Sequence, residues 1–224
     1  MNSIPPKGRS YNDVLKQMES FRDKDVNYNQ GRTWSLVYQL SHEHTNFLKQ
    51  AHSLYFSANA LNPMAFQSLK RFEHEVVRMT ADLLHGDGNV VGTMTSGGTE
   101  SCLLPVLTYR EFARSNKSSR SRAPEMIAPK SIHVAWEKGA KYFGVKMVAI
   151  PLQKNYQVDL KALKKKINSN TIMMVASAPS YPHGVIDPIK ELGQIAINHQ
   201  IPLHVDSCLG GFMLPFMEME GFKA

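Results

Sequence analysis

The chain is poor in cysteine: Cys102 and Cys208 are the two cysteines among its 224 residues. Two cysteines this far apart provide neither a disulfide framework nor a zinc-ligand spacing, so we expect a reducing compartment, the cytoplasm. No apolar run approaches the roughly 18 residues that a membrane-spanning helix needs. Residues 1–8 also lack the apolar core of a secretory signal.

The sequence also lacks the two common nucleotide-binding motifs. Without GxxxxGK followed by Ser or Thr it is not a P-loop protein, and without GxGxxG a dinucleotide-binding domain is disfavoured. The formal net charge of +7 favours an anionic partner. However, the basic stretches Arg110–Arg122 and Lys161–Lys166 do not interleave aromatic residues as a base-stacking surface does. We therefore expect solvated surface there and no nucleic-acid partner.

From residue 90 onward, apolar runs typical of buried strands alternate with helical patterns. The candidate strands are Val90–Thr95, Glu125–Ala128, Lys146–Pro151, Thr171–Ala176 and Pro202–Asp206. The candidate helices lie near Gly98–Ser115, His133–Phe143, Asp159–Ile167 and Pro188–His199. Asp187 is predicted as the N-cap of the last helix, because a proline follows it. The alternation predicts an α/β fold, with a mostly parallel sheet flanked by helices on both faces.

The first 60 residues form a polar arm with scattered aromatic residues, which is too irregular to bury itself. We expect the arm to pack on another surface, such as a second subunit. Beyond it, apolar residues recur at steps of three and four, which predicts a long amphipathic helix. These residues are Phe66, Leu69, Phe72, Val76, Met79 and Leu83. The predicted organisation is an arm at 1–60 and a sheet-containing domain at 61–224.

The most informative residue is Asp206, a single carboxylate at the end of the apolar run 201–205. A buried charge is costly unless a cation or a hydrogen bond meets it. Ligands of open α/β sheets bind at the carboxyl ends of the strands. The protonated pyridine nitrogen of pyridoxal 5′-phosphate (PLP) would stabilise this anion, and a capping role in the next turn would explain the residue equally well.

Residues 95–101, Thr-Ser-Gly-Gly-Thr-Glu-Ser, follow the first candidate strand and open a helix. Gly97 and Gly98 let backbone N–H groups approach an anion closely, and a helix N-terminus favours negative charge. The hydroxyls of Ser96 and Thr99 are further candidate donors. The segment predicts a phosphate-binding cup, with a tight strand-to-helix turn as the alternative.

Three histidines lie among these predicted ligand-binding segments. His133 begins a candidate helix, where it either stacks on a flat heteroaromatic ring or caps the helix. His204 and Asp206 share one face of a strand, and His183 lies in a loop shaped by two prolines and a glycine. No convincing third ligand joins them, so we expect no metal site.

In combination, these features resemble the fold-type I PLP enzymes and, within the PLP-dependent decarboxylase group, the sphingosine-1-phosphate lyase family. The resemblance covers nearly the whole chain from about Ile4 and rests on the strings at 31–38, 91–101, 141–146, 182–188 and 204–212. The most particular are Met-Thr-Ser-Gly-Gly-Thr-Glu-Ser at 94–101 and Pro-His-Gly-Val-Ile-Asp-Pro at 182–188. The implied fold is the PLP-binding large domain, incomplete at 61–224 and without the small C-terminal domain.

The resemblance implies a set of cofactor-binding residues. Gly98 and Thr99 would hold the PLP phosphate, and His133 would stack on the ring. Asp206 would pair with the pyridine nitrogen and keep it protonated, so that the ring can accept electrons. Ser177 matches a position near the cofactor in related decarboxylases.

The implied catalytic residues are His133 and Asn62. Asn62 stands before Pro63, where the animal enzymes have the His of a His-Pro active-site loop. The family's Schiff-base lysine follows a His a few tens of residues beyond the strand-end Asp. None of the nine histidines is followed by Lys, and Lys223 lies too near Asp206. We therefore expect the Schiff-base lysine to be absent from this chain, which alone would lack the amine that the reaction needs.

The resemblance also implies an activity and a partner. The family's substrate is a phosphorylated long-chain amino alcohol, cleaved between carbons 2 and 3 to a fatty aldehyde and phosphoethanolamine. A homodimeric PLP-dependent carbon–carbon lyase, truncated here, is therefore expected. The alternatives are a catalytically dead fragment that binds PLP or a second subunit, and an amino-acid decarboxylase. For localisation, the alternatives to the cytoplasm are the endoplasmic reticulum membrane and export by a bacterium into a host.

Overall fold

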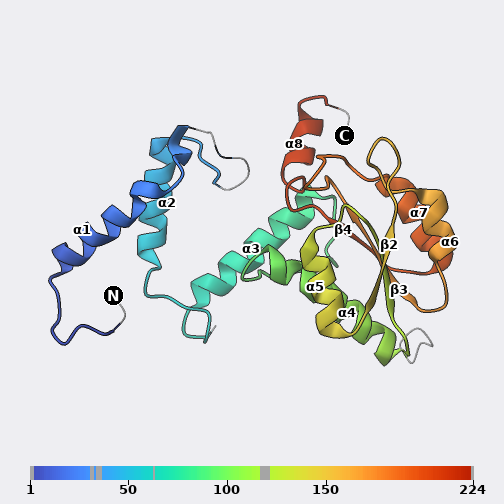
Figure 1. The fold of residues 1–224 in the computed structure, drawn as a ribbon, viewed down its shortest axis with the longest axis horizontal. Helices are drawn as coiled ribbons and strands as arrows, with labels where there is room; N and C mark the ends of the chain where they lie inside the picture. The colour runs from blue at the N-terminus through green and yellow to red at the C-terminus, as the bar shows by residue number, and fades with distance from the viewer. Residues whose placement is uncertain (1–2, 31–32, 34–36, 63, 117–121, 223–224) are drawn as a thin grey trace. The chain divides into compact units, whose positions relative to one another are not determined.

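The computed structural model describes residues 3–30, 33, 37–62, 64–116 and 122–222. The chain divides into two compact units, Met1–Phe66 and Gln67–Ala224. The second unit contains the sheet, its covering helices and all the predicted cofactor-binding residues (Figure 1). The sequence predicted an arm at 1–60 that packs on a second subunit, and a domain at 61–224. This division stays a prediction, because the structure contains one chain.

Four parallel strands form the sheet, in the order β2-β1-β3-β4. Their bounds are β1 Glu125–Pro129, β2 Lys146–Ile150, β3 Thr171–Ser177 and β4 Leu203–Asp206. Every residue of the two central strands, β1 and β3, is buried. Continuous burial of this kind is expected where helices cover both faces of a parallel sheet. The sheet and its flanking helices confirm the predicted α/β fold.

The path of the chain through the sheet reverses between β1 and β3. From β1 the chain passes through α5 (Val134–Phe143) to β2 on one side, then returns through α6 (Leu160–Lys166) to β3. It continues through α7 (Ile189–His199) to β4. In such a doubly wound sheet a crevice opens at the carboxyl edge, where the strand order reverses. β1, β3 and β4 therefore all end at a ligand-binding edge.

Helices cover both faces of this sheet (Figure 1), and each face has its own hydrophobic core. On one face, α4 (Gly98–Ser115) contributes Val106 and α5 contributes Trp136. Both belong to the same hydrophobic core as Met126 of β1. On the other face, α6 and α7 contribute Leu163 and Leu192. The split follows from the two-residue period of a strand, because consecutive side chains point to opposite faces.

The segment Val90–Thr95 was expected to be the first strand, and this prediction is wrong. The structure has no strand there, and no strand among the described residues pairs with it. Its backbone is held locally instead: Val90 N donates to Asp87 O at 3.3 Å and Met94 N donates to the Glu73 carboxylate at 2.8 Å. An apolar alternating pattern indicates a strand only where a neighbouring strand accepts its hydrogen bonds.

The predicted N-cap of α7 is also wrong. Pro188 is the N-cap, and it makes no side-chain capping bond. The carboxylate of Asp187 is used elsewhere: it accepts hydrogen bonds from Val158 N at 3.1 Å and Ser177 N at 2.9 Å. Asp187 therefore ties the loop after β3 to the segment that leads into α6.

The amphipathic helix predicted from the apolar stripe is confirmed as α3 (Gln67–Leu83). Part of its stripe is not covered, however, because Phe72, Val76 and Met79 are exposed. After β4, the chain ends its regular structure with α8 (Met213–Met219). No helix among the described residues is long and apolar enough to cross a membrane.

The first unit is more regular than the sequence indicated. It contains α1 (Tyr11–Phe21), the 3₁₀ turns η1 (Arg22–Lys24) and η2 (Tyr28–Gln30), and α2 (His42–Leu54). Ser10 and Ser41 cap the two helices by accepting from Asp13 N and His44 N. None of the described residues of this unit is buried. Helix caps and local bonds, rather than an apolar core, define its structure.

Candidate functional site

Asp206, the last residue of β4, joins three segments that are far apart in sequence. Its Oδ2 accepts a hydrogen bond from Nε1 of Trp136 in α5 at 2.9 Å. The Sγ of Cys102 in α4 lies 3.9 Å from the same oxygen. Oδ1 accepts a longer bond, 3.3 Å, from the backbone N of Cys208. The carboxylate is half-buried, with Oδ1 the less engaged of its two oxygens.

The thiol of Cys102 is held in its protonated form. Burial raises its pKa to about 12, and the negative charge of Asp206 adds to this effect. A protonated thiol is a weak donor to the carboxylate and a poor nucleophile. Cys102 therefore acts here as a small, mostly apolar neighbour of Asp206.

The first turn of α4 offers free backbone donors. Its first helical hydrogen bond runs from Ser101 N to Gly97 O, and the N–H groups of Gly98, Thr99 and Glu100 have no partner among the described residues. A Cβ built on Gly97 or Gly98 would meet no atom within 4 Å. Open space in front of unpaired N–H groups is what an anion needs at a helix N-terminus.

Side chains around this turn brace it from within. The Glu100 carboxylate accepts from Ser96 N at 2.7 Å and from Ser96 Oγ at 2.6 Å, and these bonds hold the pKa of Glu100 below its ordinary value. The hydroxyls of Thr95 and Ser101 lie 2.7 Å apart. Ser96, which was expected to donate to a phosphate, is thus directed to Glu100 instead. Ser96 and Glu100 are four residues apart, one more than the spacing of a capping box, so that pattern did not indicate these bonds.

His133 is the N-cap of α5. Its Nδ1 accepts a hydrogen bond from Ala135 N at 3.2 Å. In the neutral ring, Nε2 then carries the proton. The residue is exposed and follows β1 at the carboxyl edge. The capping alternative is therefore present in the structure, and it leaves the ring accessible, so a stacking role stays a prediction.

Ser177, the last residue of β3, is buried beside β4. It is the register partner of Asp206, and the next residue, Ala178, donates its N–H to Asp206 O at 2.9 Å. Its own N–H donates to the buried Asp187. Ser177 therefore stands between the two carboxylates of this edge.

The loop after β4 is pressed against the loop after β3. A Cβ on Gly210 would lie 2.0 Å from the carbonyl oxygen of Ala178 and 2.8 Å from Cδ of Pro179. Only glycine permits this close approach of two backbones. The contact fixes the turn that follows Asp206.

The structure thus places Gly98, Thr99, His133, Ser177 and Asp206 on elements that meet at one edge of the sheet. Asn62 is not among them, because it belongs to the first unit. Its Oδ1 accepts from Met64 N at 3.0 Å, and its catalytic role stays a prediction. Lys223 and Pro63 lie outside the described residues.

The histidines considered as metal ligands are used differently. His183 stacks on Tyr156, with ring centroids 4.5 Å apart. His204 lies against Trp136 at 4.9 Å, and burial lowers its pKa. Within the described part of the chain, no group of three or more His, Cys, Asp or Glu residues could hold a metal ion.

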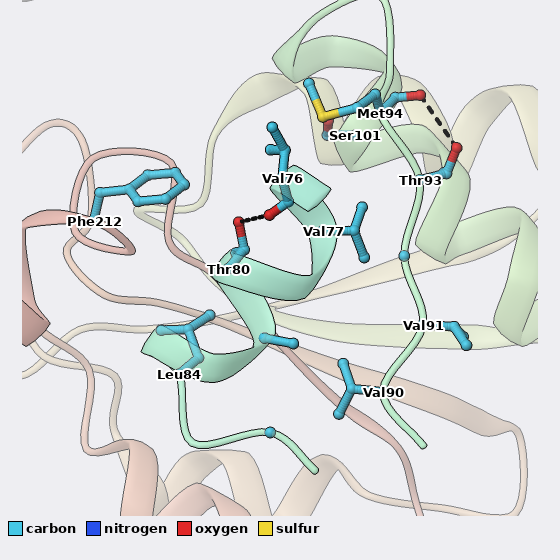
Figure 2. A pocket seen from close by; sticks show the side chains of 13 residues that line it. Val76, Val77, Thr80, Leu84, Val90, Val91, Thr93, Met94, Ser101 and Phe212 are labelled. Atoms are coloured by element: carbon cyan, nitrogen blue, oxygen red, sulfur yellow. Dashed lines mark hydrogen bonds between the residues drawn. The ribbon is translucent and has the colours of Figure 1, made fainter. Parts of the chain in front are cut away.

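An apolar pocket of ≈ 670 Å³ lies beside the first turn of α4 rather than at Asp206. Figure 2 shows Val76 and Val77 of α3 on one wall, together with Leu84 of the turn that follows α3. Val90 and Met94 of the next segment lie on another wall. Ser101 and Phe212 complete it. None of the predicted cofactor-binding residues lines this pocket. Its wall at 90–94 is the segment that was wrongly expected to join the sheet.

Comparison with known proteins identifies the family and the fold. A model of the pyridoxal-dependent decarboxylase conserved domain matches residues 55–223. The chain belongs to this family. Its sequence is similar to sphingosine-1-phosphate lyase 1 of Rattus norvegicus, with 41% identity over 99% of this chain and 39% of the relative. The sphingosine-1-phosphate lyase of Oryza sativa subsp. japonica is 44% identical over 98% of this chain and 41% of the relative.

A solved structure agrees with these sequence matches. The sphingosine-1-phosphate lyase of Burkholderia pseudomallei superposes with a TM-score of 0.89 at 37% identity, over 99% of this chain and 52% of that one. This chain spans about two fifths of the length of the two curated relatives.

The family implies PLP as cofactor, and the residues of this structure fit it. The unpaired N–H groups of Gly98 and Thr99 suit a phosphate, and Oδ1 of Asp206 has lone pairs left for a pyridine N–H. Cys102, which contacts Asp206, lies one turn after Gly98 on α4, about 6 Å along the helix axis. The anion site and the carboxylate are therefore close enough to serve one small planar ligand.

Proposed function

We propose that this chain is part of a PLP-dependent carbon–carbon lyase that acts on a phosphorylated long-chain amino alcohol. The proposed products are a fatty aldehyde and phosphoethanolamine. The observation that carries the proposal is the Asp206 carboxylate, oriented at the sheet edge beside the free N-terminus of α4, in a chain similar to sphingosine-1-phosphate lyases. No observation favours amino-acid decarboxylation or a purely binding role.

In this proposal each residue acts on the bound cofactor in a simple way. PLP, when bound, accepts the electrons released as a bond to the substrate's α-carbon breaks. Gly98 and Thr99 bind its phosphate through their backbone N–H groups. Asp206 accepts the N–H of the pyridine nitrogen and so holds a proton there. His133 covers the ring face, and Ser177 lies at the adjoining strand end.

The sequence assigns no residue to covalent attachment of PLP. It holds no His-Lys pair, and the proposal does not depend on any lysine of this chain. What the described residues supply is non-covalent: an anion site, a carboxylate for the ring nitrogen and a loop fixed by Gly210.

The direct test uses the purified full-length protein, meaning the whole lyase of which this chain is proposed to be a part. It is incubated with PLP and a phosphorylated sphingoid base. Mass spectrometry should detect fatty aldehyde, trapped as a hydrazone, and phosphoethanolamine in equal amounts. Omission of PLP is the control and should abolish both products. Release of CO₂ from an amino acid, with no aldehyde from the sphingoid base, would contradict the proposed function and indicate a decarboxylase instead.

We further propose that the full-length protein is a homodimer located in the cytoplasm. Support for a second subunit comes from the first unit, where Tyr11, Phe21, Tyr38 and Phe56 are exposed. Aromatic side chains in that number on a surface favour a protein partner. Light scattering coupled to size exclusion tests the dimer, and cell fractionation tests the location. A monomeric mass would contradict the first, and a membrane-bound pool the second.

A further inference from the structure

Trp136 is a fully buried residue whose one polar atom reaches the functional site. Its ring is 0% exposed and belongs to the core between the sheet, α4 and α5. Its Nε1–H donates to Asp206 Oδ2 at 2.9 Å, across 70 residues of sequence. A buried indole usually finds an acceptor for its N–H. Here the acceptor is the carboxylate assigned to the cofactor.

The two side-chain donors at Oδ2 differ in strength. The indole bond has the length of an ordinary N–H···O bond, whereas the Cys102 thiol, 3.9 Å away, is a weak donor. Oδ1 has one backbone donor, Cys208 N at 3.3 Å. The orientation of the carboxylate therefore depends mainly on Trp136, which leaves Oδ1 as the oxygen with acceptor capacity to spare.

We propose that Trp136 is a positioning residue for Asp206: its indole N–H holds Oδ2 and thereby presents Oδ1 to the pyridine nitrogen of PLP. The inference rests on the proposed function. It adds that the first turn of α5 contributes twice to the site, through His133 as N-cap and through Trp136 three residues later. The core that stabilises the fold also fixes the angle of the carboxylate.

A positioning role differs from a packing role in what its removal changes. Trp136→Phe keeps an aromatic ring in the core and deletes the donor. If the indole acts through the carboxylate, the effect of this substitution on PLP affinity must vanish once the carboxylate is gone. If the indole only packs, the effect must persist unchanged. A double-mutant cycle with Asp206→Ala separates the two.

The experiment measures PLP affinity of the full-length protein by equilibrium dialysis. Trp136→Phe should weaken PLP binding by about 10-fold or more, because about 10-fold is the lower end of what a hydrogen bond to a charged group contributes. In the Asp206→Ala background the same substitution should change the affinity less than about 2-fold. Val106→Ala is the control for packing, because Val106 lies in the same core and has no side-chain donor that could bond to Asp206. It should lower stability and leave PLP affinity unchanged.

A second measurement does not depend on the Phe variant folding well. In protein labelled with fluorotryptophan, the ¹⁹F resonance of Trp136 should shift when PLP is added. This shift should be absent in Asp206→Ala.

Three results would overturn the inference. The first is a Trp136→Phe variant that binds PLP as tightly as the wild type does. The second is an equal loss of PLP affinity when Trp136→Phe is introduced into the wild type and into Asp206→Ala. The third is an unaltered affinity in Asp206→Ala alone, which would remove the proposed function together with the inference. A loss in Asp206→Ala without a loss in Trp136→Phe leaves the proposed function standing and rejects the role of Trp136.

Discussion

Asp187 and Asp206 lie at the same edge of the sheet and are held in opposite ways. Asp187 is 3% exposed, and each of its oxygens accepts one backbone N–H, from Val158 and from Ser177. Asp206 is half-buried, and its stronger bond comes from a side chain, the Trp136 indole. The Asp187 carboxylate is thus buried and bonded to backbone N–H groups, whereas the Asp206 carboxylate is partly accessible and bonded mainly to one side chain.

The difference separates a structural carboxylate from a functional one. Burial raises the pKa of Asp187, and its two backbone bonds only partly offset that effect. Such a residue joins segments and, at 3% exposure, is closed to a ligand. Asp206 is less buried, and its Oδ1 has a single, longer bond. Burial and the type of donor together distinguish the two residues.

The largest effect should come from Asp206→Asn. We expect kcat/KM for the phosphorylated sphingoid base to fall about 100- to 1,000-fold, because the amide cannot balance a protonated ring nitrogen. Asp187→Asn is the matched control and should change kcat/KM only as far as it lowers the folded fraction. Steady-state kinetics with both variants makes the comparison. Equal losses in the two variants would contradict the division drawn between the carboxylates.

The next largest effect should come from the close contact between the loops that follow β3 and β4, and it should be seen in the free energy of unfolding. Gly210→Ala should cost about 3 kcal/mol of unfolding free energy, because the new Cβ meets a backbone oxygen that cannot move freely. Gly193→Ala in α7 is the control, since a Cβ there meets no atom within 4 Å, and it should stabilise the helix by up to about 1 kcal/mol. Urea unfolding of both variants gives the two values. Equal stability would mean that the loops are not pressed together.

Asp187→Asn should reduce stability by about 2 kcal/mol near pH 4, because the amide NH₂ faces a backbone N–H and one bond is lost. The loss should depend on pH. The folded pKa of Asp187 is raised above the ordinary value of 3.8, so its contribution is fully present below that value and decreases as pH rises through the folded pKa. The advantage of the wild type over Asp187→Asn should therefore shrink from pH 4 upward, in unfolding curves measured across that range. An advantage that grows with pH would contradict the raised pKa.

The smallest effect should come from a buried side-chain hydroxyl that makes no hydrogen bond to the described residues. The hydroxyl of Ser180, in the loop between Ser177 and Asp187, is buried without a partner among the described residues. Ser180→Ala should be neutral or stabilise the protein by up to about 1 kcal/mol, because an unsatisfied buried hydroxyl is costly. Calorimetry can detect the sign. A clear decrease in Tm would contradict this prediction and show that the Ser180 hydroxyl makes a hydrogen bond in the folded protein.

Local patterns in the sequence predicted most of the fold. The helix at Gly98–Ser115 has the predicted bounds, and the strands that begin at Glu125, Lys146 and Thr171 begin where apolar runs indicated. These elements are defined by their own residues and by burial on both faces. The strand expected at Val90–Thr95 shows the limit, because strand pairing depends on a partner that no local pattern reveals.

The sequence indicated several residues that the structure places at one edge of the sheet, but not the bonds between them. Asp206 stood out as a lone carboxylate after an apolar run, and the two glycines before α4 indicated an anion site. The bond from Trp136 to Asp206 crosses 70 residues, and the contact with Cys102 crosses 104. The sequence indicated no role beside Asp206 for either residue. Asp187 was assigned to the nearest helix for the same reason, whereas its partners lie 10 and 29 residues away.

The wide sequence separation of the contacts around Asp206 also sets an order of events during synthesis. Contacts between distant residues form late, because the intervening chain must be ordered first. As β4 leaves the ribosome last among the four strands, the nascent chain presents the anion-binding turn of α4 long before the carboxylate arrives to complete the pair.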